Sequence, residues 1–151
     1  STINIQGDLQ IANNSSLATA LASTWAAAYK DNSDNTTNVA GNVAHGSTSD
    51  FATITIPAQA TGSYPINASC AAAACAGIEL DLGVTSSLQV ECFCTLETGT
   101  IVVTSISSSS VQGTFSGTGT CDQTASPFGT TAWTVTNGSF STPLITSPPS
   151  L

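Results

Sequence analysis

The chain has 151 residues, with nine acidic side chains against a single basic one, Lys30, so its net charge is −8. Because proteins bind nucleic acid through clustered Lys and Arg, this balance excludes nucleic acid as an expected partner. Catalysis at neutral pH mostly uses imidazole, amine or guanidinium groups. With one lysine, no arginine and one histidine, the chain is predicted not to be an enzyme.

Composition indicates a single folded domain over residues 1–151. Apolar residues make up 40% of the chain, and a domain of about 150 residues buries roughly 68–70% of its unfolded surface, so we expect no cofactor or metal to be needed. No apolar run is long enough to predict a membrane span. Because the sequence opens at Ser1, contains no methionine and has five cysteines, we interpret it as a mature extracellular or cell-surface protein.

The first predicted element is a strand over residues 2–11. Ile3, Ile5, Leu9 and Ile11 occupy positions of one parity and would share one face of the strand. The segment 1–12 that contains it is expected either to pair within its own sheet or to be exchanged between subunits.

A helix is predicted over residues 16–30. Leu17, Leu21, Trp25 and Tyr29 recur every four residues in an alanine-rich stretch, and the preceding Asn and Ser residues are suitable N-caps. We expect this amphipathic helix to pack on a β-sheet.

The rest of the chain predicts β structure. Residues 31–49 are polar and are interpreted mostly as loop, with Val39 and Val43 indicating only a short, weak strand. Seven short β segments follow, at 51–56, 78–84, 88–96, 100–106, 111–118, 132–137 and 139–146. Regular short strands favour an antiparallel β-sandwich or an open barrel. Residues 107–110 are expected to connect a hairpin, Asn137 and Gly138 to form a turn, and 146–151 to be an extended tail.

A family resemblance lies within residues 99–140, where GTIVVTSI, VQGTFSGT and WTVTNGSF follow one another. This run resembles an uncharacterised family of small secreted β-sandwich domains and lipoproteins of Bacteroidota, with the pattern "GtItIts…vsGTFsft…vtItnGsF". The resemblance implies a β-rich bacterial surface protein and transfers no catalytic residue. The chain differs from the family in carrying Cys92, Cys94 and Cys121 in the matching half and no lipid-anchor cysteine near Ser1.

The five cysteines predict two intrachain disulfides. Cys92 and Cys94 lie at i and i+2, so in a strand they point to one face, whereas Cys70 and Cys75 flank the loop CAAAAC. A C-x-C pair closes on itself only with strain, so we expect Cys92 and Cys94 each to reach a different partner among Cys70, Cys75 and Cys121. The fifth cysteine is left free or paired between chains. Zinc binding by four thiolates and free buried thiols are the alternatives.

Two acidic pairs, Asp31 with Asp34 and Glu79 with Asp81, are the candidate calcium ligands, because carboxylates suit a hard cation. The run DNSDNTTNVAG lacks the ordered spacing and terminal Glu of an EF-hand loop, so we predict no metal and a solvated loop. His45 lies close in sequence to two serines and an aspartate, but without a G-x-S-x-G elbow it is interpreted as a surface-loop histidine.

Two functions from different classes follow. The first is a structural protein, the subunit of a surface fibre, pilus-like polymer or coat, which assembles with its own copies by strand addition, by disulfides or by both. The alternative is a monomeric cell-surface module that binds a glycan or a protein through its loops, with Trp25 or Trp133 exposed. The alternating strand AWTVTN, however, favours a core position for Trp133.

Overall fold

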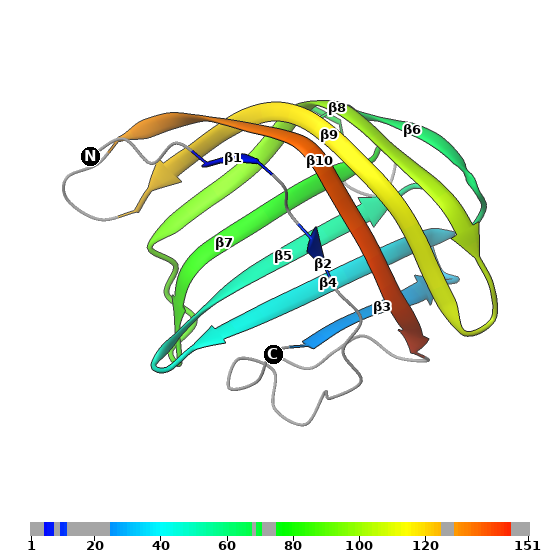
Figure 1. Ribbon diagram of the computed structural model, residues 1–151, viewed down its shortest axis with the longest axis horizontal. Helices are drawn as coiled ribbons and strands as arrows, with labels where there is room; N and C mark the ends of the chain where they lie inside the picture. The colour runs from blue at the N-terminus through cyan, green and yellow to red at the C-terminus, as the bar shows by residue number, and fades with distance from the viewer. Residues whose placement is uncertain are drawn as a thin grey trace.

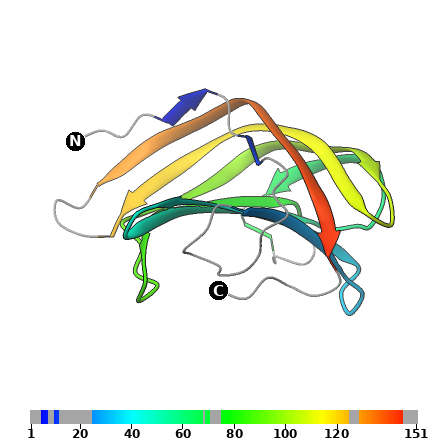
Figure 2. The ribbon, with the colours of Figure 1, turned by 60° about the horizontal axis from the view of Figure 1, so that its bottom comes forward.

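The computed structural model describes residues 5–7, 10–11, 25–67, 69–70, 75–124 and 129–145. These residues form β-strands and contain no helix. In chain order the strands are β1 (Ile5–Gly7), β2 (Gln10–Ile11), β3 (Trp25–Asp31), β4 (Thr36–His45), β5 (Thr48–Ile56), β6 (Gly62–Asn67), β7 (Gly77–Thr85), β8 (Cys92–Ile106), β9 (Ser110–Gln123) and β10 (Thr130–Ile145). The long strands β8, β9 and β10 curve over the layer that contains β3, β4, β5 and β7 (Figures 1 and 2).

Seven of these strands form a closed barrel. Antiparallel pairing runs through β3, β4, β5, β7, β8, β9 and β10 in that order. The circle closes because β10 ends in parallel beside β3, with Leu144 opposite Ala28 and Ile145 opposite Tyr29. An extra strand, β6, pairs with the second half of β8, whereas β7 pairs with its first half. The predicted mainly β class is therefore confirmed. The sheet is a closed barrel, not the predicted antiparallel sandwich or open barrel, and β10 also has parallel neighbours in β1, β2 and β3.

The barrel interior holds the main hydrophobic core. Alternate residues of a strand point inward, as in β5, where Ala52, Ile54 and Ile56 are buried and the residues between them are only partly buried. Trp133 on β10 is among the largest fully buried side chains and is 1% exposed, which confirms its predicted core position. Residues from β3 to β10 contribute to this one cluster.

The predicted helix over residues 16–30 is wrong for its last six residues, which lie in β3. This strand pairs with β4 along its whole length. Alanine favours a helix when packing does not decide, but Ala26 and Ala28 fill the barrel core, and Ala27 packs with Ala40 in a second cluster. Tertiary pairing therefore overrides the local helix preference here. Residues 16–24 and the predicted tail 146–151 lie outside the described residues.

The predicted loop over residues 31–49 is also wrong, because β4 occupies its centre and β5 begins at Thr48. The Asn, Thr and Gly residues of β4 are typical of loops, yet Thr36, Thr37 and Asn42 are buried. Pairing with β3 on one edge and β5 on the other satisfies the backbone of this strand, so its polar composition does not prevent it from forming.

The last predicted turn is replaced by a bulge. Asn137 and Gly138 lie inside β10, where the register with β9 shifts between Val135 and Gly138. The predicted hairpin connection at residues 107–110 is confirmed, since the Ser107 N–H donates to the Ser110 carbonyl at 3.0 Å between β8 and β9.

Two facing glycines let β8 and β9 approach closely beside a bulge. Gly99, with a φ of 143°, lies opposite Gly117, and the register shifts nearby, between Leu96 and Thr98. A β-carbon on Gly117 would lie 2.2 Å from the carbonyl oxygen of Thr98. Only glycine fits at such a distance from main-chain atoms.

Candidate functional site

Two short pieces of the N-terminal segment lie along one edge of β10. In parallel pairing, Ile5 of β1 is opposite Trp133 and Gly7 is opposite Val135, while Ile11 of β2 is opposite Phe140. Figures 1 and 2 show β1 and β2 following β10. Of the other predicted assembly residues, Ile3 and Leu9 lie outside the described part of the chain.

Three separate strands each pair with part of this edge of β10. The other edge pairs continuously with β9 apart from the bulge, whereas this one is shared by β1, β2 and β3, each in parallel. β1 contributes three paired residues and β2 two. If these two pieces left, the main-chain groups of β10 between Trp133 and Phe140 would form an open sheet edge, which is a template for another strand.

The extra strand β6 presents a different edge, which is poorly suited to strand addition. Pro65 has no N–H to donate, and the Asn67 N–H already donates to the Ala76 carbonyl at 3.3 Å. Proline on an edge strand is a common way of preventing sheets from joining.

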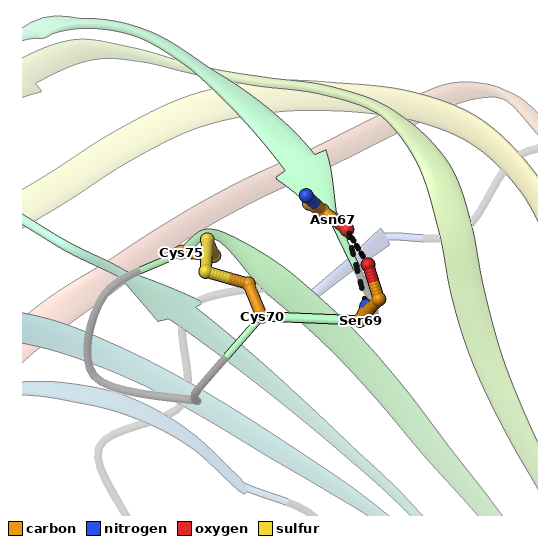
Figure 3. The surroundings of a disulfide bond; sticks show 4 residues. All are labelled: Asn67, Ser69, Cys70 and Cys75. Carbon is orange, nitrogen blue, oxygen red and sulfur yellow. Dashed lines mark hydrogen bonds between the residues drawn. A yellow bond between two sulfur atoms is a disulfide. The ribbon is translucent and has the colours of Figure 1, made fainter.

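The first disulfide joins Cys70 and Cys75 across a short loop beyond the end of β6 (Figure 3). At the start of this loop, Asn67 Oδ1 accepts hydrogen bonds from the Ser69 N–H at 3.1 Å and from the Ser69 hydroxyl at 2.7 Å. The loop is therefore held at its base by a side-chain turn and closed by the covalent bond.

The second disulfide joins Cys94 on β8 to Cys121 directly opposite on the neighbouring strand β9, and it lies in the barrel core. Both residues are buried, and Cys92, two residues earlier on the same face of β8, is a free cysteine that is 2% exposed. The prediction of two intrachain disulfides is confirmed. The expected partner for Cys92 is wrong, because Cys70 and Cys75 pair with each other across their own loop.

The sulfur atoms of Cys92, Cys94 and Cys121 all lie within 4.8 Å of one another, and we call these residues the sulfur cluster. In the described part of the chain, no other group of three potential metal ligands is this close. Because two members are joined in a disulfide, they do not offer the thiolates that zinc requires. Burial raises the pKa of the Cys92 thiol, and the charges of Asp122 and Glu91 raise it further.

The first acidic pair holds a turn. Asp31 Oδ1 accepts hydrogen bonds from the Ser33 N–H at 2.9 Å and the Ser33 hydroxyl at 2.6 Å. Asp34 Oδ1 accepts from the Thr36 N–H at 3.2 Å and the Thr36 hydroxyl at 2.6 Å. These contacts shape the β3–β4 turn, where Asn35 has a positive φ of 58°. Both carboxylates thus have a structural role.

The second acidic pair lies on the outer face of β7. Burial raises the pKa of Glu79, and the neighbouring charge of Asp81 raises it further. Burial also raises the pKa of Asp81, while its hydrogen bond with Glu79 acts in the opposite direction. Glu79 borders a hollow of about 380 Å³, whose polar lining includes Thr53, Thr55, Asn67 and Thr95.

His45 ends β4 and is exposed, with its Nε2 at 2.9 Å from Asp50 Oδ2. The other carboxylate oxygen of Asp50 accepts a hydrogen bond from the Gly83 N–H at 3.1 Å. These contacts link the β4–β5 hairpin to β7. Ser49 is fully buried, so it does not complete a hydrolytic triad with this pair.

The edge of β10 that pairs with β1 and β2 is the feature that the sequence analysis did not predict. Alternation of apolar residues predicts which face of a strand is buried, but it does not specify which strand lies beside it or in which direction. The N-terminal strand over residues 2–11, in contrast, was predicted from its alternation alone. Burial of Trp133 removes one of the two aromatic residues proposed for ligand binding, and the side chain of Trp25 lies outside the description.

Comparison with known proteins gives no relative. No family model matches the chain, and neither a curated protein nor a solved structure matches it significantly. Among the described residues, no helix is long and apolar enough to cross a membrane.

Proposed function

We propose that this protein is an extracellular structural subunit that assembles with copies of itself into a surface fibre, pilus-like polymer or coat by exchanging its N-terminal strand. The observation that carries the proposal is the parallel pairing of β1 and β2 with the edge of β10. The same pairing, supplied by a neighbouring copy, would join two subunits through main-chain hydrogen bonds.

Strand exchange would replace pairing that this chain already makes with itself. Among the described residues of the donor segment, three in β1 and two in β2 are paired with β10. The alternation of Ile3, Ile5, Leu9 and Ile11 in the sequence predicts an apolar face for the segment, and such a face would specify its register on a neighbouring sheet.

Donor and acceptor are different surfaces of one chain, so a one-way exchange is heterologous and gives an open polymer when the rotation between subunits does not close a ring. A reciprocal exchange would instead close into a dimer. Pro65 on β6 disfavours a second acceptor edge. Growth is therefore proposed to be linear, with one donor and one acceptor per subunit.

The low fraction of charged residues supports assembly, and the disulfides support an extracellular location. Charged residues make up only 7% of the chain, so few charges must lose water when copies meet. Disulfides persist mainly in oxidising compartments. Because Cys92 is 2% exposed, we propose strand exchange and not an intersubunit disulfide as the joining step. The bacterial origin rests on the family resemblance alone.

A mixing experiment tests the exchange directly. Gln6 and Thr134 are opposite each other in the parallel pairing, so Gln6→Cys and Thr134→Cys are made as separate proteins, both in a Cys92→Ser background. When the two are mixed under oxidising conditions, strand exchange predicts a disulfide between them. The doubly substituted single chain is the control that the pair can form.

A second experiment tests strand exchange by deleting residues 1–12. We expect soluble monomers by electron microscopy and size-exclusion chromatography, and a peptide of residues 1–12 should bind them at the free edge of β10. A peptide with Ile5→Asp and Ile11→Asp is the matched control. Polymers that persist unchanged after the deletion would overturn the proposal.

The second candidate function, a monomeric glycan- or protein-binding module, is favoured by the hollow beside Glu79. Its threonine hydroxyls and the Asn67 amide are groups that hydrogen-bond a sugar, and its volume is within the range of small-ligand sites. Native material that is entirely monomeric in micrographs, and whose affinity for a glycan is weakened by Thr53→Val, would favour this function over assembly.

A further inference from the structure

The sulfur cluster places a free thiol beside a disulfide in the barrel core. Cys92 and Cys94 point to the same face of β8, and all three sulfur atoms lie within 4.8 Å of one another. Cys121 is directly opposite Cys94, and Gln123 is opposite Cys92, so Cys92 and Cys121 are diagonal neighbours across the two strands. The free thiol therefore faces a sulfur to which it is not bonded.

We propose that this cluster is a thiol–disulfide exchange site, in which the Cys92 thiolate attacks Cys121 Sγ. The Cys92–Cys121 bond forms, the Cys94–Cys121 bond breaks, and Cys94 leaves as a thiolate that takes up the proton lost by Cys92. One disulfide is exchanged for another, so the step needs no external oxidant or reductant. The protein then has two covalent isomers with the same number of thiols.

The geometry also predicts which of the two isomers, Cys94–Cys121 or Cys92–Cys121, predominates. Diagonal neighbours on paired strands lie about 7–8 Å apart at their Cα atoms, which is longer than a disulfide spans without movement of the backbone. Forming the Cys92–Cys121 bond therefore requires the start of β8 to move toward β9. Cys92 is the first residue of β8, where such a movement disturbs the fewest strand pairs. The Cys94–Cys121 isomer is the major form.

The surroundings of Cys92 make the exchange slow at neutral pH. Burial raises the pKa of its thiol, and the carboxylates of Asp122 on β9 and Glu91 just before β8 raise it further, while the neutral Gln123 is its cross-strand partner. Since only the thiolate attacks, the rate is expected to rise about tenfold per pH unit below that pKa.

Disulfide mapping of the wild-type protein tests the exchange. The protein is incubated at pH 7 and pH 9, quenched in acid, unfolded and labelled with a maleimide, and the labelled cysteine is identified by mass spectrometry. We expect one labelled thiol per chain throughout, with labelling at Cys94 that appears faster at pH 9. Cys92→Ser is the control, because it removes the attacking thiol and should leave Cys94 unlabelled. Labelling at Cys94 no higher than in that control would overturn the proposal.

A second variant tests the alternative bond without relying on the rate. In Cys94→Ser the major isomer cannot form, so the isolated protein is expected to contain a Cys92–Cys121 disulfide and no free thiol in the sulfur cluster. Two free thiols at Cys92 and Cys121 in a variant that retains the wild-type circular dichroism spectrum would contradict the exchange. Neither result depends on assembly, since both experiments use the full chain and identify the bonded and free cysteines within each chain.

Discussion

At the scale of single residues, the close approach of β8 and β9 depends on positions that tolerate no side chain. We predict that Gly117→Ala lowers the free energy of unfolding by about 1–3 kcal/mol, because overpacking against main-chain atoms cannot relax cheaply. The new β-carbon would lie 2.2 Å from the Thr98 carbonyl oxygen. Urea denaturation measures the change. Gly77→Ala is the matched control, since nothing lies within 4 Å of its β-carbon, and an equal loss there would contradict the steric explanation.

The raised pKa values of Glu79 and Asp81 predict how the stability of the protein depends on pH. Because the pKa values of both carboxyls are raised in the folded protein, the folded state holds protons more tightly than the unfolded chain does. Their contribution to stability is therefore present at acidic pH and is lost as the pH rises through the folded pKa values. Glu79→Gln should stabilise the protein at pH 7, by up to about 1 kcal/mol for a partly exposed pair.

Urea denaturation between pH 3 and pH 7 measures this effect. The difference between Glu79→Gln and the wild type should shrink toward acidic pH, where the wild-type carboxyl is already neutral. Asp34→Asn is a useful control, because this residue accepts hydrogen bonds from Thr36 as a turn carboxylate. That change should lower stability at pH 7. A Glu79→Gln effect that is constant with pH would rule out the titration as its cause.

At the scale of elements, strands with clear alternation could be predicted and strands with ambiguous composition could not. Ile78 and Leu80 alternate with acidic residues, and β7 lies where expected. β3 was mistaken for a helix because its alanines favour helices, and β4 was mistaken for a loop because of its Asn, Thr and Gly residues. In both, the deciding interaction is pairing with strands distant in sequence, which local propensity does not contain.

The two disulfides should contribute unequally to stability. They join residues separated by 27 positions in Cys94–Cys121 and by 5 in Cys70–Cys75. In the loop-entropy description their removal costs about 3.5 and about 2 kcal/mol respectively. Paired Ser substitutions with denaturation measure both. In native protein treated with a thiol reductant, Cys70 and Cys75 should react first, since they are only partly buried whereas the other disulfide is enclosed in the core. The reverse order would contradict this arrangement.

At the scale of the whole molecule, net charge should control association. A charge of −8 makes every copy repel every other. Raising the salt concentration from about 10 mM to about 150 mM shortens the screening length from about 30 Å to about 8 Å. We therefore predict faster assembly at the higher concentration, measured by light scattering. Residue 1–12 deletion variants should show no such increase. Assembly that slows with salt would mean that attraction between opposite charges drives it.

The number of layers and the closure of the sheet could not be predicted from the sequence. An antiparallel sandwich and an open barrel share the same strand pattern, because alternation records burial and not the identity of the neighbour. The candidate site was predictable only on its donor side, where Ile5 and Ile11 alternate with polar residues. The acceptor edge depends on the parallel pairing of β10 with β1 and β2, and no local sequence pattern predicts pairing between segments so far apart in the chain.

The seam between β10 and β3 has a consequence for how the chain folds. Among the described residues it contains two pairs, Leu144 with Ala28 and Ile145 with Tyr29. These partners are separated by most of the chain, so the seam cannot form until β10 has been synthesised. Closing so long a loop is entropically costly and slow. During that interval one edge of β3 is unpaired and could pair with a strand of another newly made copy. Pairing of β10 with this edge ends that period.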